Sequence, residues 1–144
     1  RTAPPPFMTN FDAPNREQFC SRRERSNTPL QALQLMNDVQ HFEAARALAQ
    51  SILLESTTAD ADTQRLRLLF RIVLARPPAE PELPLLQQAL RQQREHYRAH
   101  PDDARNLIRN GESKPADSLE PTELAAWTML CNLVLNLDET VCRN

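Results

Sequence analysis

Four arginines occur within ten residues near the start of the chain, at positions 16, 22, 23 and 25. Guanidinium groups match the planar geometry of carboxylates, sulfates and phosphates. This spacing predicts an anion-binding or partner-binding cluster. Its members are Asp12, Arg16, Arg22, Arg23, Arg25 and Asn27 of the leader, with Asp138 and Glu139 from the C-terminal end. In a second interpretation, the same arginines are neutralised in a structural network, since ion-pair networks imitate binding sites. The acids available for that network are Glu17, Glu24, Asp138 and Glu139.

The acids Asp138 and Glu139 are adjacent near the end of the chain and could be taken for a catalytic pair. Neighbouring residues on a helix diverge by about 100°, so the two carboxylates do not face one substrate. We expect both to close the last helix, where negative charge opposes the helix dipole. This cost predicts a cationic partner, and an arginine of the leader is the natural candidate. We assign no catalytic residue.

Two histidines, His96 and His100, are spaced four apart, which places both imidazoles on one helix face. No third ligand lies nearby in the sequence, and Pro101 predicts that the helix frays there. We therefore favour a solvated pair over a metal site and assign no metal ligand. The sequence around His41 and Glu43 is not an HExxH motif, and we expect these polar side chains to face outward.

The three cysteines, Cys20, Cys131 and Cys142, form no CxxC or CxxCH motif, so zinc knuckles and covalent haem attachment are not predicted. On one helix, Cys131 and Cys142 would be ~16 Å apart, too far for a disulfide. We expect the cysteines to be small buried hydrophobes. A cysteine protease with Cys20 as nucleophile lacks an assigned histidine and oxyanion donors. No cofactor is predicted for this chain.

The composition has a single glycine, Gly111, against twelve prolines. One glycine excludes glycine-rich phosphate loops and disfavours hairpin-rich β folds. The net charge of -2 disfavours nucleic-acid binding, and no apolar run is long enough to span a membrane. The chain begins at Arg1 inside a proline-rich run, so we expect a piece of a larger protein.

The pattern of apolar residues predicts an all-α fold, a bundle of five to six helices preceded by an extended leader. Residues 1–27 form the leader, which continues from a missing upstream part and docks on the core through Phe7, Met8 and Phe11. Residues 28–144 form the bundle domain. The helices are predicted at about 28–37, 39–55, 62–75, 81–99, 102–109 and 121–141, the last being the most buried.

Local signals set these bounds. Thr28-Pro29-Leu30-Gln31 is a capping box with proline at the first helical position. Asp38 caps the next helix, which turns Val39, Phe42, Ala45, Leu48 and Ile52 inward. Pro77 and Pro78 end the third helix, Pro84 fits only the first turn of the fourth, and Gly111 is a left-handed cap.

Several motifs together resemble a planctomycete-specific domain of unknown function, and the resemblance covers essentially the whole chain. The longest match runs from Phe11-Asp12-Ala13-Pro14-Asn15-Arg16 through Cys20 to Arg22-Arg23-Glu24-Arg25-Ser26-Asn27-Thr28-Pro29-Leu30-Gln31-Ala32-Leu33. Shorter matches are Leu35-Met36-Asn37-Asp38, Gly111-Glu112-Ser113, Leu124-Ala125-Ala126-Trp127 and Asn136-Leu137-Asp138-Glu139-Thr140. Val39 departs from the family, where proline is common after the Asn-Asp pair. Arg1-Thr2 is similar to the end of that domain's upstream half.

The resemblance implies a C-terminal domain of a large protein bearing cytochrome-c-like domains, so haem would bind elsewhere in the full-length protein. It implies export to the periplasm or cell envelope of a planctomycete-type bacterium, and sulfatase-like partners. The chain itself leaves the compartment open. Our first hypothesis is a non-catalytic domain that packs against the upstream domains or a partner protein. The second is a role in an enzyme or binding protein for anionic polysaccharide, sulfated or uronic, clamped by Arg22, Arg23 and Arg25.

Overall fold

The chain folds into an all-α bundle, as its sequence predicts. The computed structural model describes residues 5–14, 19–22, 26, 28–55 and 61–141. Within these residues it contains helices and no strand. The eight helices described are α1 (Pro6–Asn10), α2 (Pro29–Asn37), α3 (Val39–Glu55), α4 (Ala61–Leu74), α5 (Glu82–Ala99), α6 (Pro101–Ile108), α7 (Pro121–Leu135) and α8 (Asp138–Val141). None of them combines the length and apolar character needed to cross a bilayer.

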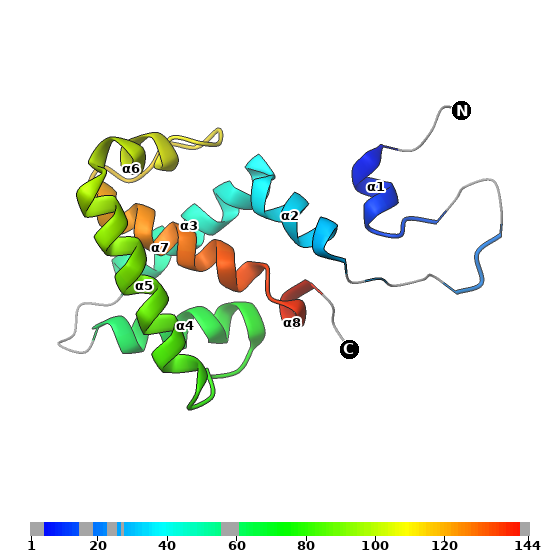
Figure 1. Cartoon of the computed structure of the whole chain (residues 1–144), viewed down its shortest axis with the longest axis horizontal. Coiled ribbons are helices and arrows are strands. Elements are labelled where there is room, and N and C mark those ends of the chain that lie inside the picture. Colours follow the sequence, from blue (N-terminus) through cyan, green and yellow to red (C-terminus); the bar gives the residue numbers. More distant parts are fainter. Residues whose placement is uncertain (1–4, 15–18, 23–25, 27, 56–60, 142–144) are drawn as a thin grey trace.

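Helix α7 is the centre of the bundle. It packs most extensively against α3, and then against α5 and α6, which surround it (Figure 1). Its buried side chains include Leu124, Trp127, Leu130, Cys131 and Val134. A helix that is apolar on nearly every side must be covered on nearly every side. The prediction that the last long helix is the most buried element is confirmed.

The local signals at helix ends act as predicted. Thr28 Oγ1 accepts a hydrogen bond from the backbone N–H of Gln31 at 3.3 Å, and Gln31 Oε1 accepts one from the Thr28 N–H at 3.0 Å. Asp38 Oδ1 accepts from the N–H of His41 at 2.9 Å and so caps α3. Pro84 lies in the first turn of α5. Because these signals depend on a few neighbouring residues, the bounds of α2 to α6 follow from the sequence to within one or two positions.

The end of the bundle differs from the single helix predicted over 121–141. Helix α7 stops at Leu135, and α8 begins separately at Asp138. At the break, Asn136 Nδ2 donates to the carbonyl of Asn132 at 3.1 Å, and Thr140 Oγ1 donates to the carbonyl of Val134 at 2.8 Å. The Asn132 carbonyl keeps its helical bond from the Asn136 N–H. The Val134 carbonyl, which a continuing helix would pair with the N–H of Asp138, instead accepts from the Leu137 N–H and the Thr140 hydroxyl, and α7 ends there.

The leader also differs from the prediction. Residues 6–10 form α1 rather than extended chain, and α1 lies beyond α2, away from α7 (Figure 1). Phe7 and Met8 were expected to dock on the core, but both are exposed. Phe7 instead stacks on Phe11 with ring centroids 4.7 Å apart. Val39, expected to face inward, is exposed as well.

Candidate interaction surface

The arginine cluster of the leader is only partly visible. Arg16, Arg23, Arg25 and Asn27 lie outside the described residues, as do Glu17 and Glu24. Arg22 is exposed. Asp12 accepts hydrogen bonds at 2.6 Å from both the backbone N–H and the hydroxyl of Ser26. The Asp12 carboxylate therefore binds the leader's own backbone. The anion-binding site stays a prediction.

The cysteines differ from one another. Cys131 is fully buried in α7, as expected of a small hydrophobe, and burial raises the pKa of its thiol. Cys20 is exposed, which contradicts the expectation of a buried side chain. Its thiol donates to the carbonyl of Arg22 at 3.2 Å. Cys142 lies outside the described residues.

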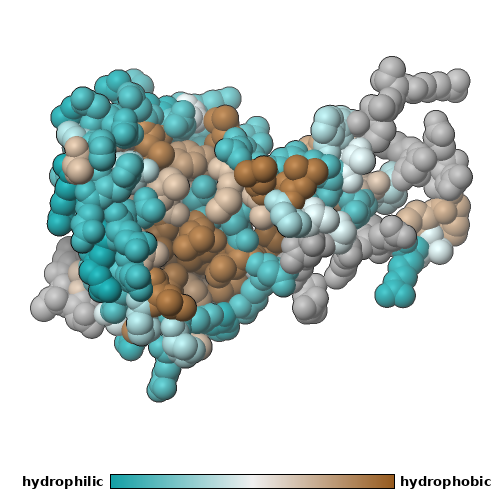
Figure 2. All heavy atoms as spheres, viewed as in Figure 1, coloured by the Kyte–Doolittle hydropathy of each residue, from teal (hydrophilic) through white to brown (hydrophobic). Residues whose placement is uncertain are grey.

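Helix α2 distributes its side chains in the reverse of the usual order. Leu30 is 54% exposed, Leu33 56% and Met36 41%, whereas the one buried residue of the helix is Gln31, at 3%. The three apolar residues are spaced three apart and so share one side of the helix. Figure 2 shows brown, apolar atoms gathered over α2, next to a second brown area over α7. This exposed set, the α2 face, consists of Leu30, Leu33 and Met36.

The buried Gln31 holds α2 and α1 together. Its Nε2 donates to the carbonyl of Asn10 at 2.6 Å and to the hydroxyl of Ser26 at 3.0 Å. A further bond runs from Asn10 Nδ2 to Gln34 Oε1 at 2.7 Å. The helix therefore uses its polar side chains for contacts within the chain and leaves its apolar side chains outside. This arrangement fixes the α2 face before any partner binds it.

The two C-terminal acids occupy a different place from the one expected. Asp138 and Glu139 lie in the first turn of α8, where negative charge is favoured by the helix dipole. Glu139 pairs with Arg76, at 2.6 Å and 2.7 Å from its two oxygens, and not with an arginine of the leader as predicted. Arg76 also holds Glu82 at 2.8 Å and 2.9 Å. Its guanidinium lowers the pKa of Glu139, and brings that of Glu82 to about 2.

A second polar cluster, which sequence reasoning missed, lies between α3 and the loop that follows α6. Glu43 accepts from the backbone N–H groups of Glu112 at 2.9 Å and Ser113 at 2.7 Å, and from the Ser113 hydroxyl. Arg46, only 2% exposed, donates to the carbonyls of Ile108 at 3.0 Å and Ser113 at 2.9 Å. The Ser113 hydroxyl and the loop N–H groups bring the pKa of Glu43 to about 2.

This cluster, the loop clasp, corrects two expectations. Glu43 does not face outward but turns toward the loop, and the imidazole Nε2 of His41 is buried. Gly111 has the predicted positive φ, 107°, but it lies in the loop, since the C-cap of α6 is Arg109. An added Cβ at Gly111 would come within 2.6 Å of the Glu43 carboxylate. The glycine thus lets the loop approach Glu43 closely.

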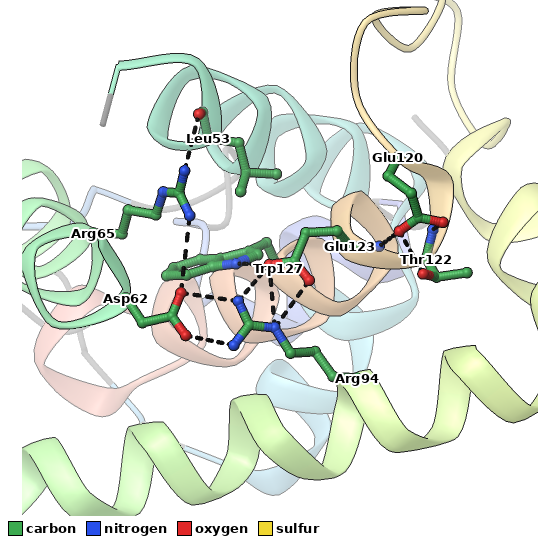
Figure 3. A network of polar contacts seen from close by, with 8 residues as sticks. All are labelled: Leu53, Asp62, Arg65, Arg94, Glu120, Thr122, Glu123 and Trp127. Atoms are coloured by element: carbon green, nitrogen blue, oxygen red, sulfur yellow. Dashed lines mark hydrogen bonds and ion pairs between the residues drawn. The ribbon is translucent and has the colours of Figure 1, made fainter. Parts of the chain in front are cut away.

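The third cluster joins three helices through Arg94 of α5 (Figure 3). Its guanidinium donates to Asp62 of α4 at 2.5 Å and 2.9 Å, and to Glu123 of α7 at 2.9 Å. Glu123 in turn accepts from the indole N–H of the buried Trp127 at 3.0 Å. The hydrogen bonds from Arg94 lower the pKa of Asp62. A carboxylate held this way stays ionised at neutral pH, so the cluster supports packing rather than proton transfer.

The histidine pair lies where α5 meets α6, and both imidazoles are exposed. Their ring centroids are 4.9 Å apart. Among the described residues, no group of three or more histidine, cysteine and acidic side chains is placed to hold a metal ion. Within the part of the chain that the structure describes, the pair therefore offers two ligands and no third.

Comparison with protein families gives one match. The family model PSD1, described as "Protein of unknown function (DUF1553)", matches residues 1–90, which is more than half of the chain. The chain belongs to this family. No curated protein and no solved structure gives a significant match.

The match to the PSD1 family ends in the middle of α5, at the buried Leu90. Helices α6 and α7 follow this point, yet α7 supplies the centre of the core. The PSD1-matching residues therefore form one folding unit with the described residues that follow them, 91–141. The α2 face lies inside the matched part, as do α1 and α3, the helices against which α2 mainly packs, whereas α7 lies outside it.

Proposed function

We propose that this chain is a non-catalytic helical domain whose α2 face binds an apolar protein surface. The observation that carries the proposal is the inverted burial of α2, which exposes Leu30, Leu33 and Met36 and buries Gln31. Full burial of a leucine or methionine side chain is worth about 1.5–3 kcal/mol. A fold that leaves three such side chains largely in water gains stability when another surface covers them.

The charge of this region supports an apolar partner. Neither α1 nor α2 contains an ionised side chain, although a quarter of the chain's residues are charged. Protein interfaces are depleted of charge at their centres and enriched in methionine and aromatic residues. The exposed Phe7 and Met8 of α1 add to this composition.

The hydrogen bonds that hold α2 in place support a binding surface formed in advance. The capping box fixes the start of α2, and Gln31 ties α2 to α1 through the Asn10 carbonyl. A face held in place before binding loses less conformational entropy when a partner arrives. The α2 face has the fixed geometry that a docking helix needs.

The partner in this proposal is the upstream part of the same protein. The sequence resemblance favours a large, exported planctomycete protein with cytochrome-c-like domains, in which this domain is C-terminal. A contact within one chain tolerates a modest apolar face, because tethering raises the effective concentration of the partner. A sulfatase-like partner protein is the other source of such a surface.

The test compares two substitutions, each in this chain alone and in the protein encoded by the complete gene. Leu33→Asp changes the α2 face. Leu85→Asp is the matched control, since Leu85 is an exposed leucine on α5. We expect Leu33→Asp to lower the melting temperature of the complete protein by several degrees and to leave this chain nearly unchanged, while Leu85→Asp changes neither.

Equal melting temperatures of the complete protein with Leu33→Asp and with Leu85→Asp would contradict the proposal. A titration with sulfated and uronic oligosaccharides adds the remaining comparison. Salt-sensitive binding that is lost in Arg22→Ala would favour the anionic-polysaccharide hypothesis instead.

A further inference from the structure

The two exposed histidines at the end of α5 have a defined relation to each other. His96 lies in the last turn of α5, and His100 is the residue between α5 and α6. Their ring centroids are 4.9 Å apart and their planes are inclined by 31°. Two imidazoles with this ring separation are close enough to bind one metal ion together.

A hydrogen bond fixes which nitrogen of His100 is basic. His100 Nδ1 lies 3.0 Å from the backbone carbonyl of His96. A carbonyl oxygen only accepts, so Nδ1 carries the proton and Nε2 keeps its lone pair. Histidines that ligate metals very often donate their other N–H to a carbonyl or carboxylate, which orients the ring. His100 already has this arrangement.

The ring of His96 is held from the other side. It meets the ring of Tyr97 edge to face, with centroids 4.9 Å apart and planes at 76°. Tyr97 is buried in the core. The two imidazoles are therefore attached to a fixed helix end, so chelation demands little reorganisation.

We propose that His96 and His100 form a two-imidazole site for a divalent transition-metal ion. Imidazole nitrogen suits Cu²⁺, Ni²⁺ and Zn²⁺, and affinity follows the order in which Cu²⁺ binds most strongly. No third ligand from the described residues joins the pair. Water completes the coordination, and the site is an exchangeable one rather than a closed structural one.

The experiment is a calorimetric titration of the whole chain with Ni²⁺ and, separately, Zn²⁺ at neutral pH. We expect one ion per chain, and roughly tenfold or greater weakening in His96→Ala and in His100→Ala, because each variant loses the chelate. His41→Gln removes the third histidine of the chain and is the matched control. Cys20→Ser controls for the exposed thiol. Both controls should bind as the wild type does.

Binding by His96→Ala or His100→Ala as strong as that of the wild type would overturn the proposal, as would the absence of binding up to millimolar metal. Thermal melting gives an independent measurement. The metal should raise the melting temperature of the wild type and of both controls, because it binds the folded pair, but not that of the two alanine variants. His96, His100 and Cys20 are exposed, so their variants should fold, and the melting curve of His41→Gln shows whether that partly buried position tolerates the change.

Discussion

Helices α2 and α7 begin in the same way, but the side chains of α7 are mostly buried and those of α2 mostly exposed. Each has proline at its start and a side-chain cap, Thr28 for α2 and Glu120 for α7. Each is rich in leucine. Yet nine side chains of α7 are buried, whereas α2 buries only Gln31. The comparison teaches that local sequence determines where a helix forms, while the neighbouring helices determine whether its apolar side chains find cover.

The sharpest way to break this comparison is to remove α7. A chain ending at residue 90 keeps the PSD1-matching part and loses α6, α7, α8 and half of α5. Without α7, the inner faces of α3 and α5 are exposed, so we expect no cooperative unfolding transition. Circular dichroism melting measures this. The full chain is the control, and a cooperative transition in the shorter chain would show that α7 is not the centre of the fold.

A single substitution on each helix sharpens the same contrast. Trp127→Ala removes a fully buried indole from α7, and we expect the free energy of unfolding to fall by about 3–5 kcal/mol. Met36→Ala removes an exposed side chain from α2 and should change it by less than about 0.5 kcal/mol. Urea unfolding measures both values. Similar losses for the two variants would mean that α2 is packed as tightly as α7.

The loop clasp extends the comparison to buried polar groups. Arg46→Ala leaves the carbonyls of Ile108 and Ser113 without their donor, and we expect a loss of about 2 kcal/mol in the free energy of unfolding. Arg105→Ala breaks the exposed pair with Asp102 and should cost less than about 0.5 kcal/mol. Urea unfolding again provides the values. Equal effects would show that burial adds nothing to the Arg46 contacts.

The acid dependence of stability concerns the carboxylate of the loop clasp. The pKa of Glu43 is about 2 in the folded chain against an ordinary value of 4.5. A lowered carboxyl pKa stabilises the fold above the unfolded value, and this contribution is lost as the pH falls from about 4.5 to about 2. Glu43→Gln should therefore lose less stability over that interval than the wild type. Chemical unfolding at several pH values measures the difference, and identical slopes would contradict the role of Glu43.

The sequence predicted those features of the fold that depend on neighbouring residues. The capping box at Thr28, the Asp38 cap and the positive φ of Gly111 each follow from a short segment. So does the apolar character of α7. The break after Leu135 does not follow from the periodicity, because it depends on the Leu137 N–H and the Thr140 hydroxyl, which both bind the Val134 carbonyl in an otherwise apolar, helix-forming segment.

The candidate surface was harder to predict, because it depends on contacts between distant segments. Periodicity placed Val39 inward, but it is exposed next to α2. The sequence predicts a partner for Glu139 in the leader, whereas the structure pairs Glu139 with Arg76, a residue distant in sequence. The sequence pattern does not predict that Leu30, Leu33 and Met36 face outward. Helix α2 is short and has no charged residue, so its pattern of apolar and polar residues does not determine which side faces water.

Hydrogen exchange of the α2 backbone tests the central claim most directly. The amides of residues 29–37 are to be followed in this chain alone and in the protein encoded by the complete gene, with α7 as the internal reference. We predict that protection of α2 increases at least about tenfold in the complete protein, because a bound surface suppresses local opening, while protection of α7 stays governed by global unfolding. Equal exchange of α2 in the two proteins would contradict the proposal that the α2 face binds another part of the molecule.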